Sequence, residues 1–269
     1  SHTQQRHRIN PTPMLQLVSL ATLAAAGPPL LALRGGADAS GIAHCAGAGL
    51  TLADAIRVYT YPKEVVERSG TSSDDVPALI TARSEGQWRA GLMIMLLADA
   101  SDARALVALS HYLCAVNLLG DIPGNDAIGA PQAPIVVLVA VFAALGYATA
   151  RKMVPLWLSP ALAISNGLQF YLVPKRAWAM YGADGMGTSN LALVLTRRVG
   201  WAIVLRGIYL WAIIAGVARK NAFGIVFAAA ALDSILHALS GQASIMGMSP
   251  RTQALVVGFA TLVAAASFV

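Results

Sequence analysis

Long apolar stretches separated by short polar segments run along most of the chain. Several of them approach the roughly 20 residues that a helix needs to cross the hydrocarbon core of a bilayer. The pattern predicts helices at 14–33, 40–60, 86–99, 103–120, 132–150, 154–173, 191–218, 221–241 and 251–269. We therefore expect an all-α protein, a polytopic transmembrane bundle of about eight helices, with 14–33 as an extra N-terminal anchor.

Charged residues interrupt this pattern in two ways. The polar segment 62–85 carries eight charged residues, so we expect it to be an extramembrane loop, helical in part. Inside the apolar stretches, Asp54 and Arg57 lie one turn apart and are expected to neutralise each other. A lone charge at membrane depth is costly, so Arg206 is expected to pair with Asp233 on the following helix.

Two sets of short motifs recur along the chain. YPKEVVERSG at 61–70 is followed by ARSEGQW at 82–88, and VPKRAWAMYG at 173–182 is followed by TRRVGWAI at 196–203. The spacing predicts an N-terminal segment at 1–39 and two similar four-helix repeats, at 40–150 and 151–269. Because each repeat has an even number of helices, both would have the same orientation in the membrane. The alternative is that membrane helices flanked by Pro and Lys resemble one another by composition.

Composition supports the membrane interpretation. The chain is 57% hydrophobic and 12% charged, with a mean hydropathy of +0.62, whereas a soluble domain carries roughly 25% charged residues. Disorder, a coiled coil and an ordinary soluble enzyme are therefore excluded. The net charge is −2 over residues 1–150 and +8 over residues 151–269. This basic half suits anionic lipids or acidic partner subunits, and not nucleic acid, because it contains no continuous basic run.

Few motifs indicate chemistry. The segment GADGMG at 182–187 lacks the Lys-Ser/Thr pair of a phosphate-binding loop, and the motifs of zinc proteases and serine hydrolases do not occur. Cys45 and Cys114 have no metal-ligand spacing and are interpreted as buried structural thiols. We therefore expect no enzymatic activity and no metal site.

Three histidines lie in predicted apolar helices. His44, His111 and His237 are candidate cofactor-binding residues, because a neutral imidazole is a good axial ligand for the magnesium of a chlorophyll. The alternative is that each makes a hydrogen bond to a neighbouring helix. His237 also stands four residues after Asp233, so the pair could instead relay a proton in a transporter.

Each predicted four-helix unit resembles a family of small uncharacterised bacterial-type membrane proteins. In that family the first helix ends in a loop containing Pro, as at 61–70, and the second opens with Arg and Gly, as at 82–88. The resemblance spans residues 40–269 and implies a fold without an agreed chemistry. The segment LALRGGADAS at 31–40 is similar to Arg-Gly-Gly-rich presequences of algae with secondary plastids.

These features predict a non-catalytic accessory subunit of a large organellar complex. The first expectation is a photosystem in the thylakoid membrane of a plastid, where the protein would link core and antenna and contact chlorophyll and carotenoid. Its partners would be other membrane subunits, lipids and pigments. A mitochondrial respiratory accessory subunit in the inner membrane is one alternative. A small-solute or proton-coupled transporter, with Arg206, Asp233 and His237 as its site, is the other.

Overall fold

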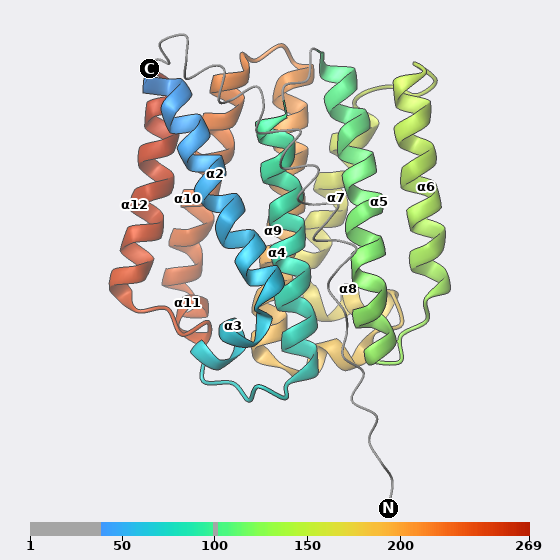
Figure 1. The fold of residues 1–269 in the computed structure, drawn as a ribbon, viewed down its shortest axis with the longest axis vertical. Coiled ribbons are helices and arrows are strands. Elements are labelled where there is room, and N and C mark those ends of the chain that lie inside the picture. Colours follow the sequence, from blue (N-terminus) through green and yellow to red (C-terminus); the bar gives the residue numbers. More distant parts are fainter. Residues whose placement is uncertain (1–38, 99–101) are drawn as a thin grey trace, which may run out of the picture.

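Eight long helices stand side by side in a bundle in the computed structural model, which describes residues 39–98 and 102–269 (Figure 1). The described residues form helices and no strand, so the predicted all-α class is confirmed. The long helices are α2 (Ala39–Thr60), α4 (Val76–Leu97), α5 (Ala103–Ala127), α6 (Ala133–Ala150), α7 (Leu158–Leu172), α9 (Asn190–Ile214), α10 (Arg219–Leu239) and α12 (Pro250–Ser267). Short helices join them: α3 (Pro62–Arg68), α8 (Pro174–Met180), the 3-10 helix η2 (Asp184–Thr188) and α11 (Gln242–Ile245).

The long helices agree with the predicted ones from residue 40 onward, and the largest differences are in the ends of two helices. Helix α4 begins at Val76, ten residues before the predicted start at 86, and α5 continues through Pro123 to Ala127. The segment 62–85, predicted to be a loop that is helical in part, consists of α3, a connection at 69–75 and the first part of α4. The polar residues of α4 face the interior of the bundle, where Ser84 and Glu85 are buried. The predicted helix at 14–33 lies outside the described residues.

Local sequence signals set the ends of the helices. The side chains of Asp75, Asp102, Ser189 and Ser249 accept hydrogen bonds from backbone N–H groups in the first turns of α4, α5, α9 and α12. These N-caps satisfy donors that have no partner within the helix. After α3 and α8 the chain turns sharply at Gly70 and Gly182, whose φ angles of 74° and 72° favour glycine.

The long helices pack in pairs. Helix α2 packs on α4, α7 on α9, α5 on α6 and α10 on α12, while α4 and α9 pack against each other in the centre. Close approach depends on two glycines. A Cβ atom on Gly86 would lie 2.6 Å from the carbonyl oxygen of Ala55, and one on Gly200 would lie 2.6 Å from that of Gly167. Larger residues at these positions would separate the paired helices.

Three of the described helices, α5, α6 and α10, are long and apolar enough to cross a membrane. About eight spanning helices were expected, and three of the described helices have the length and composition to span a membrane. Helices α2, α4 and α9 carry charged residues, and α7 has 15 residues. Helix α6 exposes Val136, Val137 and Val141 on the outside of the bundle. Such an apolar outer surface is typical of contact with lipid or with other membrane subunits.

Candidate functional site

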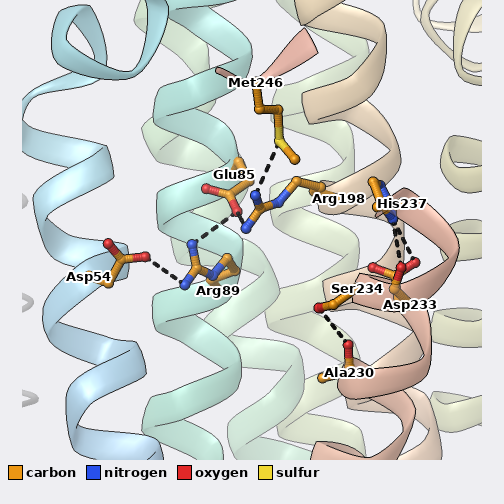
Figure 2. Close-up of polar contacts among 9 residues, drawn as sticks. All are labelled: Asp54, Glu85, Arg89, Arg198, Ala230, Asp233, Ser234, His237 and Met246. Atoms are coloured by element: carbon orange, nitrogen blue, oxygen red, sulfur yellow. Dashed lines mark hydrogen bonds and ion pairs between the residues drawn. The ribbon is translucent and has the colours of Figure 1, made fainter. Parts of the chain in front are cut away.

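Four charged side chains from three helices form a continuous network inside the bundle (Figure 2). Arg89 on α4 lies 2.9 Å from the Asp54 carboxylate on α2 and 3.1 Å from the Glu85 carboxylate one turn earlier on α4. Arg198 on α9 lies 3.0 Å from the same Glu85 oxygen. Glu85 thus bridges two guanidinium groups, and the network joins the two central helices to α2.

The burial of this network differs along its length. The Glu85 side chain is 2% exposed, those of Arg89 and Arg198 are 17% and 29% exposed, and that of Asp54 is 52% exposed. The two positive and two negative charges balance, which offsets part of the desolvation cost of bringing them inside the bundle. Arg198 also donates to the thioether sulfur of Met246, at 3.2 Å.

A second polar group lies on α10. The Asp233 carboxylate accepts a hydrogen bond from the Tyr171 hydroxyl at 2.9 Å and lies 3.2 Å from Nδ1 of His237. Both Asp233 and His237 are buried, and Nε2 of His237 has no hydrogen-bond partner among the described residues. The imidazole is therefore oriented by Asp233 on one side and has a free nitrogen on the other.

The network and the α10 pair line two adjoining cavities. One is about 450 Å³ and lies among α2, α4, α9, α10 and α12. The other is about 490 Å³ and extends toward the short helix α11. Both are lined by Asp54, Glu85, Arg89, Arg198 and Asp233, and the second also by His237. These volumes suit a small-molecule ligand. We call the two together the charged cavity.

Two predicted ion pairs are wrong. Arg206 does not meet Asp233; its Nη1 donates to the Ser110 carbonyl oxygen and to Sγ of Cys114, and its guanidinium lies 5.2 Å from the centre of the Trp88 ring. Sequence adjacency of two helices does not decide which of their faces meet, and Arg206 faces α4 and α5.

Asp54 and Arg57 do not form an ion pair with each other, and each pairs with a different residue. Asp54 reaches Arg89, and Arg57 pairs with Glu64 of α3 at 2.8 Å. The turn into α3 brings Glu64 back to the end of α2, where its carboxylate pairs with Arg57.

The three candidate histidines lie in three separate places. Nε2 of His44 is 3.2 Å from the Leu96 carbonyl oxygen, and its ring stacks on Phe223 with 3.7 Å between centroids. His111, on α5, is 3% exposed and lines another cavity, among α4, α5, α6, α7 and α9. His237 lies in the charged cavity. The described residues contain no group of three or more His, Cys, Asp or Glu side chains that could hold a metal ion.

Sequence reasoning missed three of the main residues of the charged cavity. Glu85, Arg89 and Arg198 were assigned to a polar loop or left without a role. The signal that could have found them is the spacing of Glu85 and Arg89, four residues apart in the order that favours an ion pair on a helix.

Comparison of the chain with protein-family models, with curated proteins and with solved structures found no match. The resemblance to a family of small four-helix membrane proteins therefore stays a prediction.

Proposed function

We propose that this protein is an integral membrane transporter for a small zwitterionic solute, with its site in the charged cavity. The observation that carries the proposal is the convergence of charged side chains from α2, α4, α9 and α10 on an internal cavity. Charged groups within a membrane bundle are expensive and commonly mark a substrate or ion pathway. In this proposal all eight long helices span the membrane, and their charges face inward.

The charge pattern supports a zwitterion as substrate. Carboxylates and guanidinium groups line the same cavity, so a ligand with both an ammonium and a carboxylate group finds a partner for each. The ammonium group would approach Asp54 or Asp233, and the carboxylate would approach Arg89 or Arg198. Because these protein charges are already paired, the ligand competes with existing ion pairs, and exchange of partners offers a route to reversible binding.

A proton is the coupling ion in this proposal. Imidazole is a side chain that can take up and release a proton, and the Nε2 atom of His237 has no acceptor or donor partner among the described residues. Protonation would add a positive charge beside Asp233 and change the net charge of the cavity by one unit. Binding of the solute and binding of the proton would therefore influence each other.

A similar order of helices in the two halves of the chain supports transport as well. Each half begins with a long helix and a short Pro-initiated helix and continues with three long helices, and the second half has η2 and α11 in addition. Gly86 approaches Ala55 and Tyr59 on α2, and Gly200 makes the same approach to Gly167 and Tyr171 on α7. We propose that residues 40–150 and 151–269 are parallel repeats. Transporters built from repeats commonly place the substrate at the interface between them, where α4 and α9 meet.

Uptake into liposomes tests this function. The purified full chain is reconstituted with a pH-sensitive dye inside, and radiolabelled glycine, alanine, leucine, glutamate and lysine are added with and without an imposed pH gradient. We expect uptake of at least one of them to be accelerated by the gradient and accompanied by proton flux. Asp54→Asn should remove most of the uptake, whereas Glu64→Gln, at the exposed pair with Arg57, should leave it unchanged. Uptake no greater than in empty liposomes for all five would count against the proposal.

The accessory subunit of a photosystem or respiratory complex is the second candidate. The outer face of α6 favours it, because Val136, Val137 and Val141 are exposed and would suit contact with a partner subunit or carotenoid. His111 and His237 are then the candidate axial ligands of chlorophyll, while Nε2 of His44 contacts Leu96. Purification from native thylakoid or mitochondrial inner membranes tests it. Co-purification with a large complex, and a pigment lost in His111→Phe, would support this candidate.

A further inference from the structure

A second cavity of about 460 Å³ lies on the opposite side of the central helices. It is lined by α4, α5, α6, α7 and α9, and it shares no lining residue with the charged cavity. Its wall toward α6 and α7 is aliphatic, formed by Leu138, Val141, Leu145 and Leu162. Figure 1 shows α6 at the edge of the bundle, and among the described helices its main packing partner is α5.

Arg206 lies on the inner wall of this cavity and carries an uncompensated charge. The residue is 1% exposed, and its Nε and Nη2 atoms have no hydrogen-bond acceptor among the described residues. Its Nη1 atom meets only neutral acceptors, the Ser110 carbonyl oxygen and Cys114 Sγ. No carboxylate of the described residues pairs with it, and a buried cation without an anion is costly.

The acid that lines the same cavity does not neutralise Arg206. Asp121 lies seven residues after Cys114 on α5, a rise of about 10 Å along the helix. Its carboxylate instead accepts from the Trp88 indole N–H, at 3.4 Å. One end of the cavity therefore carries a cation and the other an acid, while the wall between α6 and α7 is apolar. A ligand anion is attracted to the Arg206 end, whereas the Asp121 end offers it no positive charge.

We propose that this cavity binds a single-chain organic anion, a fatty-acid carboxylate, with its head group on Arg206. The guanidinium presents two free donors that suit the two oxygens of a carboxylate, and His111 on the same wall offers a further donor. The alkyl chain lies along the aliphatic side chains of α6 and α7. The cavity volume suits one short chain and not the two chains of a phospholipid. This site is independent of the transport proposed for the charged cavity.

Equilibrium binding of radiolabelled laurate to the full chain in phosphatidylcholine nanodiscs tests the proposal. We expect saturable binding that unlabelled laurate displaces and that dodecanol displaces at least about tenfold more weakly, since the alcohol lacks the charge. Arg206→Gln should weaken laurate binding at least about tenfold. Arg151→Gln, which removes an exposed arginine outside the cavity, should leave it unchanged.

A second variant and a stability measurement separate a loss of laurate binding from a loss of folding. Ala163→Phe fills the cavity from α7 and should remove binding of both laurate and dodecanol. The melting temperature of ligand-free Arg206→Gln should equal or exceed that of the wild type, because an unpaired buried charge is removed. The proposal is overturned if Arg206→Gln binds laurate with wild-type affinity or if dodecanol displaces laurate as well as laurate itself does. It is also overturned if Ala163→Phe leaves binding unchanged, or if the protein binds phosphatidylglycerol more tightly than laurate.

Discussion

Single buried charges distinguish this chain from a bundle held together only by apolar packing. Glu85 accepts from two arginines on two helices, whereas Arg206, at a similar burial, has neutral partners. The physical consequences are opposite. Removing Glu85 leaves two cations without their shared anion, while removing Arg206 takes away a charge that no described anion offsets.

At the residue scale we predict that Glu85→Gln destabilises the protein. The loss of the bridging charge leaves Arg89 and Arg198 facing each other, and removing one member of a buried pair costs about 3–5 kcal/mol. Because both arginines retain some exposure, we expect about 2–3 kcal/mol. Chemical unfolding in a mild detergent measures it. Glu64→Gln, at an exposed ion pair, is the control, and equal stability of the two variants would contradict a structural role for Glu85.

At the scale of the element, the positions of small residues determine which helices pack closely in pairs. Gly86 and Gly200 each sit where a Cβ atom would meet the backbone of the preceding long helix at 2.5–2.6 Å. The helices themselves are specified locally, by apolar stretches, N-caps and glycines with positive φ. Their pairing depends on faces that no local signal defines, and this explains why the positions of the helices were predictable and their contacts were not.

We predict that Gly86→Ala and Gly200→Ala each lower stability by about 1–3 kcal/mol, because the added methyl group meets backbone rather than a flexible side chain. Gly49→Ala on α2 is the matched control, since nothing lies within 4 Å of its Cβ position. There the helix propensity of alanine should raise stability by up to about 1 kcal/mol. The free energy of unfolding of the three variants checks this, and a loss at Gly49 as large as at Gly86 would refute the argument from close approach.

At the scale of the whole molecule, the long helices α2 and α7 both run toward the same end of the bundle (Figure 1). Helices α3, α8 and α11 lie at one end of the bundle, and the segment between α6 and α7 lies at the other (Figure 1). If all eight long helices span the membrane, the two ends lie on opposite sides of it. The two cavities then occupy related positions in the proposed repeats. One is lined by Asp54, Glu85, Arg89, Arg198 and Asp233, and the other by Arg206 and Asp121.

Labelling with a membrane-impermeant thiol reagent tests this topology. Cys45 and Cys114 are first replaced by alanine, and single cysteines are placed at Glu67 on α3, Arg176 on α8 and Arg151 after α6, all exposed positions. We expect the cysteines at 67 and 176 to react from the same side of sealed vesicles and the one at 151 from the other side. Labelling of 67 and 176 from opposite sides would exclude parallel repeats.

The sequence by itself determined the all-α class, the places of the eight long helices and the excess of apolar surface. These features depend on local hydrogen bonding, on helix caps and on composition. All three are determined by residues that are close together in the sequence. Only the tertiary structure decided that Glu85 is shared by Arg89 and Arg198, that Asp233 meets Tyr171 and His237, and that Arg206 stands without an acid. The physical reason is that a charge takes its partner from whichever helix face is packed against it. That choice depends on the rotation of each helix and on contacts between segments up to about a hundred residues apart, such as Arg206 and Ser110.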